Sequence, residues 1–160
     1  MSSLALATVL HASLVLGGAN SYADAHRATT ETGKPMVVMV SAEWCGPCQR
    51  MKKSVLPEVE RRGVLKKVAF AVVNVDRERS LARKLTGGGA VPQLIMFRRT
   101  KDGWMRRKLV GGQSVASVEK FINEGVAASE AEQPDGEAAE SLPSSEESGA
   151  GVAAQPVGYR

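Results

Sequence analysis

Cysteine and histidine are scarce in this chain of 160 residues. The two cysteines, Cys45 and Cys48, share one Cys-x-x-Cys, and the two histidines are His11 and His26. A scaffold stapled by several disulfides needs more cysteines, so that class of protein is excluded. A structural zinc site within one chain needs four ligands, and His11 lies in an apolar leader, so we predict no metal site.

Aromatic residues make up only 4% of the sequence, and its positive charge is scattered. Residues 1–125 carry 20 Lys or Arg against 10 Asp or Glu, a net charge of +10. The basic residues fall in separate pairs between apolar positions, as they do on the solvated faces of helices and strands. Nucleic-acid binding favours a clustered basic patch with aromatic side chains that stack on bases. We therefore predict no nucleic-acid partner.

The N-terminus has no Lys or Arg ahead of a long apolar run. Residues 4–18 are mostly apolar or small, a length typical of a signal peptide and too short for a comfortable membrane span. Small residues follow the run, and we expect a signal peptidase to cut near Ser21. The sequence predicts a signal peptide or N-terminal anchor over residues 1–21. The alternative is a buried or frayed helix at the start of a cytoplasmic protein.

Large apolar residues become rare near the C-terminus. Residues 126–160 carry one Lys or Arg against seven Asp or Glu, and the rest is rich in Ala, Ser, Gly and Pro. Such a composition cannot bury enough apolar surface to offset the entropy lost on ordering. We predict a disordered acidic tail over residues 127–160, which either screens the basic body or keeps the chain soluble.

Residues 22–126 have the patterns of one α/β domain. Apolar residues at helical spacing alternate with continuous apolar runs, which are typical of buried strands. Asp76 is placed to cap a helix, and residues 100–103 give a hairpin signal. In chain order the patterns predict a helix at 22–32, a strand at 36–40, a helix at 46–56 with a new turn or second short helix at Pro57, a strand at 68–75, a helix at 77–85, strands at 94–98 and 105–110, and a helix from 114 to about 125.

The string Trp44-Cys45-Gly46-Pro47-Cys48 follows a predicted strand and opens a helix. This places the first sulfur at a helix N-terminus, where free backbone N–H groups and the helix dipole favour the thiolate. Cys45 is therefore the predicted nucleophile, and Cys48, one turn further in, is the resolving cysteine. Pro47 suits the first turn of a helix, Gly46 leaves the approach to Cys45 open, and Trp44 offers apolar contact to a substrate. The motif predicts a redox-active disulfide that needs no bound cofactor.

The sequence resembles the thioredoxin family over roughly residues 22–125. The residues that carry the resemblance are Ala42-Glu43 together with the motif at 44–48, then Asn74-Val75-Asp76, Val91-Pro92, Gly103 and Gly111. The match is most similar to exported thioredoxin-like proteins and to the thioredoxin-like domain of membrane-linked disulfide reductases. It implies the thioredoxin fold, a central mixed β-sheet flanked by helices.

The resemblance also implies a role for Val91 and Pro92. In the family the corresponding proline is cis and lies against the two cysteines, so we expect a cis Val91–Pro92 bond. The backbone of Val91 is then expected to pair with an extended substrate segment beside Cys45. The alternative is an ordinary trans proline before an edge strand.

The sequence departs from the family pattern beneath the cysteines. The family's buried aspartate and its neighbouring lysine align with Met39 and Val72. The aspartate helps to take the proton from Cys48, so here water, Glu43 or the leaving thiolate of the substrate must take it. Two further positions depart from the family pattern. Ser41 stands where the family usually has an aromatic residue, and Gln93 stands where it usually has threonine.

These features together predict a thiol–disulfide oxidoreductase. Gly-Pro between the cysteines is what reducing members of the resembled family carry, which favours a reductase of exported protein disulfides. The expected partners are disulfide-bearing proteins and a membrane or soluble thiol electron donor, and the chain is expected to be a monomer in the periplasm or at the membrane. Two alternatives are a scaffold that recruits a client through its basic face, and a metal or iron–sulfur site between the cysteine pairs of a dimer.

Overall fold

The structure, a computed structural model, describes residues 21–132. The predicted leader up to residue 20 and the predicted tail from residue 133 therefore lie outside the described residues. The elements are α1 (Tyr22–Thr32), β1 (Met36–Ser41), α2 (Gly46–Arg50), the π-helix η1 (Met51–Val55), α3 (Leu56–Arg61), the 3₁₀-helix η2 (Val64–Lys67), β2 (Ala69–Asn74), α4 (Arg79–Thr86), β3 (Gln93–Thr100), β4 (Gly103–Val110) and α5 (Val115–Glu132). Within residues 21–132, no helix has both the length and the apolar character that crossing a bilayer requires.

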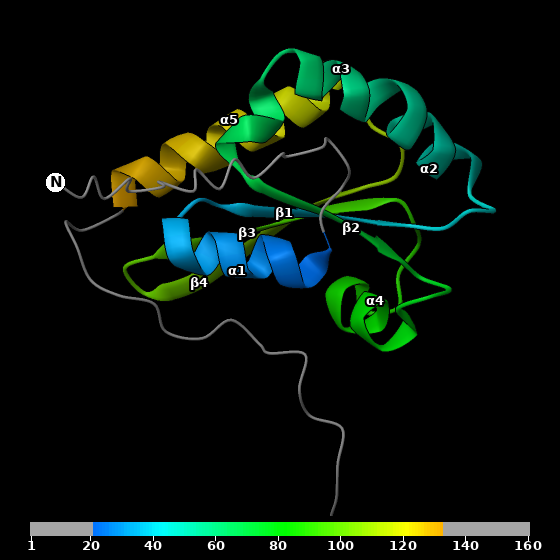
Figure 1. The fold of residues 1–160 in the computed structure, drawn as a ribbon, viewed down its shortest axis with the longest axis horizontal. Helices are drawn as coiled ribbons and strands as arrows, with labels where there is room; N and C mark the ends of the chain where they lie inside the picture. Colours follow the sequence, from blue (N-terminus) through cyan, green and yellow to red (C-terminus); the bar gives the residue numbers. More distant parts are fainter. Residues whose placement is uncertain (1–20, 133–160) are drawn as a thin grey trace, which may run out of the picture.

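Four strands form one mixed sheet in the order β2-β1-β3-β4 (Figure 1). Strand β1 runs parallel to β2 and antiparallel to β3, and β3 pairs antiparallel with β4. Parallel neighbours need a crossover connection, which α2, η1, α3 and η2 supply between β1 and β2. The β3–β4 pair is the expected hairpin, and Gly103 at its turn has the left-handed φ of 118° that favours glycine. The predicted α/β architecture with a mixed sheet is confirmed.

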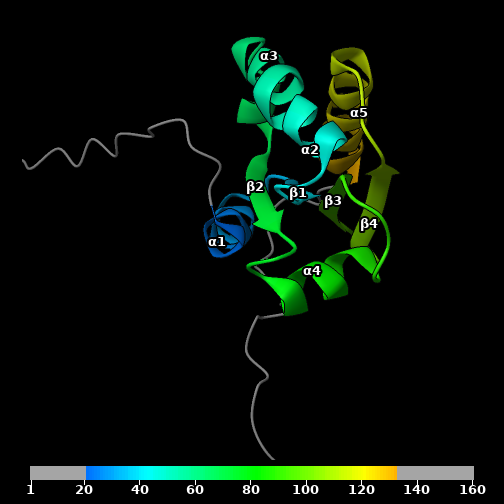
Figure 2. The same cartoon turned by 90° about the vertical axis from the view of Figure 1, so that its right-hand side faces the viewer.

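Helices cover both faces of the sheet, with α1 and α4 on one side and α2, α3 and α5 on the other (Figure 2). Alternate residues of β1 contribute to two cores, because successive side chains of a strand point to opposite faces. Met36 and Val38 pack on the α1 side, while Val37 and Met39 pack on the α5 side. All six residues of β1 are buried, which explains its continuous apolar pattern. The carboxyl end of this rigid strand leads directly into the cysteine motif.

The helix after the cysteines continues past Pro57. Segment α2 passes through η1 into α3 without a break, and Pro57 lies in the first turn of α3. At the end of η1, the Leu56 N–H donates to the carbonyl of Met51, a π-type bond that reaches one residue further back than in an α-helix. Proline has no N–H and crowds the carbonyl four residues before it, so the π segment accommodates Pro57. The second helical segment predicted there is present, but it is continuous with the first.

The predicted cap of the fourth helix is wrong. Helix α4 begins at Arg79, and Glu78 rather than Asp76 occupies its N-cap position, without a side-chain cap hydrogen bond. Asp76 lies in the turn before it and bonds to another part of the chain. The reason is that the side chain of Asn74, not of Asp76, accepts the backbone N–H groups of this turn, at 2.8 and 3.3 Å.

Helix α5 is longer than predicted, because it runs to Glu132 instead of ending near Gly125. Residues 127–132 are helical, so the predicted start of the disordered tail at residue 127 is too early. Ser129 is buried, and Glu132 forms an ion pair with Arg98 of β3, so the last turns are anchored to the sheet. Gly125 is not a terminus but a contact point: a Cβ there would overlap the buried side chain of Met96.

Candidate active site

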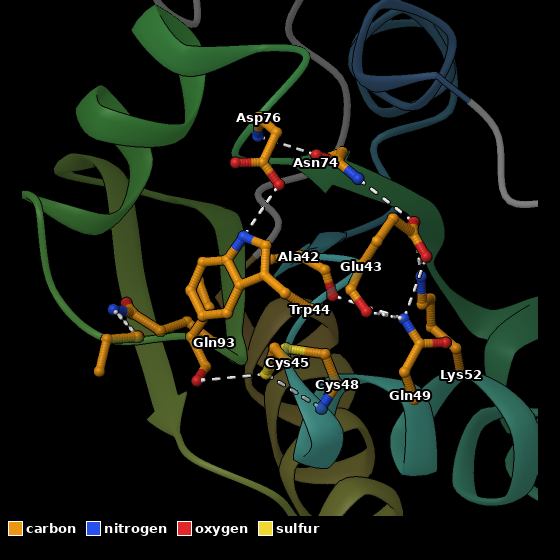
Figure 3. The surroundings of a disulfide bond; sticks show 12 residues. Ala42, Glu43, Trp44, Cys45, Cys48, Gln49, Lys52, Asn74, Asp76 and Gln93 are labelled. Atoms are coloured by element: carbon orange, nitrogen blue, oxygen red, sulfur yellow. Dashed lines mark hydrogen bonds and ion pairs between the residues drawn. A yellow bond between two sulfur atoms is a disulfide. The ribbon is translucent and has the colours of Figure 1, made fainter.

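The two cysteines lie where β1 leads into α2, and they are joined by a disulfide (Figure 3). Their Cα atoms are 5.2 Å apart. Cys45 is the N-cap of α2, with an extended backbone, and its sulfur accepts a hydrogen bond from the Cys48 N–H at 3.2 Å. The sulfur of Cys45 thus meets a backbone donor of the first helical turn, an arrangement that favours a thiolate when the pair is reduced.

The two sulfurs differ in accessibility. Cys45 retains 6% of its surface exposed, whereas Cys48 is 0% exposed. The other residues of the motif surround Cys45 on the surface: Gly46 and Pro47 are exposed, and Trp44 is 72% exposed. A partner molecule can therefore approach Cys45 along the motif, while Cys48 is reached only through Cys45.

Val91 and Pro92 border Cys45 from the loop before β3. The peptide bond between them is cis, as the resemblance implies. The Val91 carbonyl oxygen lies 3.7 Å from Sγ of Cys45, where a reduced thiol can donate a hydrogen bond to it. Pro92 is buried, and its carbonyl accepts a hydrogen bond from the Gly111 N–H at 2.8 Å. The structure thus brings Val91 and Pro92 together with the cysteine pair.

The loop between β4 and α5 also reaches the motif, a contact that the sequence patterns do not predict. A Cβ at Gly112 would lie 3.4 Å from Cβ of Pro47, within van der Waals contact. Its neighbour Gly111 has a φ of 85°, which non-glycine residues rarely adopt. The loop therefore passes close to Pro47, and its turn uses the left-handed backbone of Gly111. The glycine doublet was the available signal, but a doublet by itself does not say what it packs against.

Trp44 is held in place by Asp76, which follows β2 (Figure 3). The indole Nε1–H of Trp44 donates a hydrogen bond to Oδ2 of Asp76 at 3.0 Å. The turn that carries Asp76 is in turn fixed by the side chain of Asn74. An exposed apolar ring is thereby oriented beside Cys45 by a polar contact that joins distant parts of the sequence. Asp76 is thus part of the site, a role that its position after a strand could not reveal.

Glu43 is engaged by its neighbours and points away from the two sulfurs (Figure 3). Its carboxylate accepts hydrogen bonds from Lys52 at 3.0 Å, Gln49 at 3.0 Å and Asn74 at 3.2 Å. The hydrogen bond from Lys52, followed by that from Gln49, holds the pKa of Glu43 below its ordinary value. A carboxylate with a lowered pKa binds a proton weakly. Glu43 is therefore a poor acceptor for the proton of Cys48, although the sequence offered it as one of three.

The surroundings of Cys48 are apolar. Met39 and Val72 lie opposite each other on β1 and β2 and belong to the cluster that contains Cys48. Among residues 21–132 no carboxylate is buried. Ser41, two positions after Met39 on the same strand, has a buried hydroxyl without a hydrogen-bond partner in the described part of the chain. The same residues gather no cluster of three or more His, Cys, Asp or Glu that could hold a metal ion.

Solved structures of thioredoxins share this fold. The solution structure of a thioredoxin from Thermus thermophilus matches with a TM-score of 0.55 and 24% identity, covering 65% of this chain and 82% of that one. The thioredoxin of Trichomonas vaginalis matches with a TM-score of 0.52 and 24% identity, covering 67% and 93%. At this identity the likeness establishes the fold.

Proteins related in sequence extend the comparison beyond the fold. This chain is 36% identical over 98 residues to thioredoxin Asp f 28 of Aspergillus fumigatus, covering 61% of this chain and 82% of the relative. It is 35% identical over 91 residues to a thioredoxin of Pseudomonas aeruginosa, covering 56% and 77%. The thioredoxin family model matches residues 20–124, which include the whole site described above. With its Cys45–Cys48 pair, the chain belongs to the thioredoxin family of thiol–disulfide oxidoreductases.

Proposed function

We propose that this chain reduces disulfides in exported proteins, with Cys45 and Cys48 acting as a dithiol. The observation that carries the proposal is the unequal exposure of two sulfurs that share one disulfide, 6% for Cys45 and 0% for Cys48. This asymmetry supports Cys45 as the nucleophile and Cys48 as the resolving cysteine. The electron pair resides in the two thiols, so the reaction needs no bound cofactor.

The reaction proceeds in two exchanges. First, the Cys45 thiolate attacks one sulfur of a substrate disulfide, the substrate S–S bond breaks, and a mixed disulfide to Cys45 forms while the leaving thiolate takes up a proton. Second, Cys48 loses its proton and attacks Sγ of Cys45, which breaks the mixed disulfide. Two electrons pass to the substrate, which leaves as two thiols, and the chain keeps the Cys45–Cys48 disulfide. A membrane or soluble thiol electron donor reduces that disulfide for the next cycle.

The two thiols lose their protons by different means. The Cys48 N–H, 3.2 Å from Sγ of Cys45, stabilises negative charge on the nucleophile. For Cys48, the apolar surroundings offer no carboxylate as a base, and Glu43 is paired with Lys52. The proton of Cys48 therefore passes to water or to the leaving thiolate of the substrate. The second exchange is the step that depends most on the substrate.

Substrate recognition is assigned to the residues around Cys45. Val91 borders the sulfur and presents backbone to an extended substrate segment, next to Pro92. Trp44, with its exposed ring, offers apolar contact to a substrate. Gly46 and Pro47 leave the approach to Cys45 open. Recognition through the backbone and a single aromatic ring does not depend on a particular substrate sequence. It suits different substrates that have an exposed disulfide in common.

A turnover assay tests the proposed reduction. The full chain, with dithiothreitol as the electron donor, is expected to accelerate the reduction of insulin, and Cys45→Ser is expected to abolish the acceleration. Ser54→Ala, an exposed change in the helix that continues from α2, is the matched control and should leave the rate unchanged. Full activity of Cys45→Ser would contradict the proposal.

The direction of the reaction is tested by the reduction potential. A value near about −270 mV, typical of reducing members of this fold, supports a reductase. A value near about −120 mV would make the chain an oxidant instead. A scaffold that only holds clients would show neither turnover nor exchange.

Export is proposed on the strength of the apolar residues 4–18. Ser21 accepts a hydrogen bond from the Asp24 N–H at 3.1 Å and so caps α1, which means that a cut just before Ser21 keeps the cap. A periplasmic or membrane-tethered monomer is proposed, with the cytoplasm as the alternative. N-terminal sequencing of the protein from cells tests this: a start near Ser21 supports cleavage, and an intact Met1 in the soluble fraction would contradict export.

A further inference from the structure

A groove of about 620 Å³ lies between the beginning of α1 and α4, on the face of the sheet opposite α2 and α5. In Figure 1 the dark-blue start of α1 lies next to α4. The lining combines apolar and basic side chains, among them Tyr22, Leu81 and Phe97, and Arg79, Lys84 and Arg106. The three basic side chains are exposed, so the groove has an apolar floor and a positively charged rim.

The positive charge of this groove is not neutralised within residues 21–132. None of Arg79, Lys84 and Arg106 takes part in an ion pair there. The lining has one acidic residue, Glu78, against the basic residues Arg77, Arg79, Lys84 and Arg106, so its net charge is positive, and the Glu78 carboxylate accepts the Asn74 N–H at 3.0 Å. The complementary occupant is therefore a segment with negative charges on both sides of an apolar side chain.

The C-terminal part of this chain has that chemistry. Residues 133–160 carry five Asp or Glu and a single basic residue, Arg160. Leu142 is a large apolar residue there, and Glu140 precedes it while Glu146 follows it. The same chain thus supplies, at a fixed stoichiometry, a segment that matches both the floor and the rim of the groove.

The C-terminal segment also starts at a position from which it can reach the groove. Glu132 pairs with Arg98 of β3, and the adjacent residue Phe97 lines the groove on the opposite face of the sheet. Strand β4 is the edge that separates the two faces, and its exposed Arg106 and Lys108 add positive charge along that path. The stretch from residue 132 to residue 142 reaches about 35 Å when extended. It can therefore pass over the basic edge of β4 into the groove.

We propose that residues 137–147 bind in the groove between α1 and α4. Leu142 packs against Phe97, and the flanking carboxylates lie near Arg79 and Arg106. The acidic tail is then held on the face opposite α2, where it neutralises the basic rim and leaves Cys45 open to substrates. The rim contacts are electrostatic, so the association weakens as salt shortens the screening length from about 10 Å at 0.1 M to about 3 Å at 1 M.

Paramagnetic NMR on the full chain tests the proposal. Ser144→Cys is labelled with a nitroxide while the Cys45–Cys48 disulfide is kept oxidised, so that the new thiol alone reacts. At low salt, the amide signals of Leu81, Leu85 and Phe97 are expected to lose their intensity, and at 1 M salt they are expected to regain it. Even broadening over the whole surface, or broadening centred on α2 and α5, would overturn the proposal.

Charge-reversal variants separate the groove from net charge. Arg79→Glu with Arg106→Glu is expected to restore the groove signals, whereas Lys53→Glu with Lys66→Glu, the same charge change at exposed positions elsewhere, is expected to leave the broadening in place. Loss of the broadening in both double variants would overturn the assignment to the groove. A second measurement needs no label: Glu140→Gln with Glu146→Gln should shift amide signals of the groove, and an unchanged spectrum would contradict the proposal.

Discussion

At the scale of single residues, the hydrogen bond between Trp44 and Asp76 links an exposed ring to a turn elsewhere in the sequence. Asp76→Ala removes the acceptor 3.0 Å from the indole N–H and frees the ring. We expect kcat/KM for insulin to fall about 2–10-fold, corresponding to about 0.5–1.5 kcal/mol for one hydrogen bond, mainly through KM. Asp76→Asn keeps an acceptor oxygen and should stay close to wild type. Equal losses in both variants would show that the charge, and not the hydrogen bond, matters.

Met39 makes the core under Cys48 apolar. Met39→Asp tests how strongly this core disfavours a charged side chain. The side chain is 0% exposed, so a carboxylate there has no water and no partner. We expect the free energy of unfolding, from urea titration at pH 7, to fall by about 3–5 kcal/mol. Burial raises the pKa of the new carboxyl above its unfolded value, so the loss shrinks as the pH falls and the group is protonated.

The residue opposite Met39 supplies the control for that prediction. Val72 faces Met39 across β1 and β2, so Met39→Asp with Val72→Lys places a cation beside the carboxylate. Part of the lost stability is expected to return in the double variant. A double variant no more stable than Met39→Asp alone would mean that the two positions do not interact, contrary to their register.

Glu58 predicts a pH dependence of stability. Hydrogen bonds from Arg61 and then Arg62, with ion pairs at 2.6 and 2.7 Å, lower the pKa of Glu58 from 4.5 to about 2. A carboxyl with a lowered folded pKa stabilises the fold above its unfolded pKa, and this contribution is lost as the pH falls from about 4.5 to about 2. The urea midpoint of the wild type should therefore exceed that of Glu58→Gln at neutral pH and converge with it near pH 2.

Glu60 on the same helix provides the comparison. Its side chain pairs with no cation among residues 21–132, so Glu60→Gln makes the same change of charge without breaking an ion pair. If Glu60→Gln and Glu58→Gln behave alike, the Arg61–Glu58–Arg62 cluster is not the source of the pH dependence.

At the scale of elements, the period of the apolar pattern was enough to place the strands and most helices. All six residues of β1 are buried between the two cores, whereas β2, at the edge of the sheet, alternates between buried and half-buried residues. The misplaced ends depend on interactions that the apolar pattern does not record. The extension of α5 rests on Arg98 of a distant strand, and the continuous helix across Pro57 rests on the π segment before it.

Gly125 shows how one such contact limits an element. The glycine lets α5 approach β3, where Met96 is 1% exposed and has little room to move. We expect Gly125→Ala to lower the free energy of unfolding by about 1–2 kcal/mol, because crowding outweighs the gain of about 1 kcal/mol in helix propensity. In a Met96→Ala background the added methyl fills vacated space, and the same change should become neutral or stabilising. An identical cost in both backgrounds would contradict this packing.

At the scale of the whole molecule, the cysteine motif and the resemblance were sufficient to predict the fold and the residues around the disulfide. They could not predict the contacts that orient the site, because Asp76, Gly112 and Lys52 reach it from three separate segments of the chain. Short-range patterns carry information about the element a residue belongs to. They carry little about which surface of another element that residue meets.

The central claim is that one sulfur receives the substrate and the other resolves it. The most direct test is mass spectrometry of the complex that Cys48→Ala forms with a disulfide-bearing protein such as insulin. We predict a stable mixed disulfide at Cys45, and none when Cys45 is also replaced by Ser. A mixed disulfide at Cys48 in the converse Cys45→Ala variant, formed as readily, or no mixed disulfide at Cys45, would contradict the account.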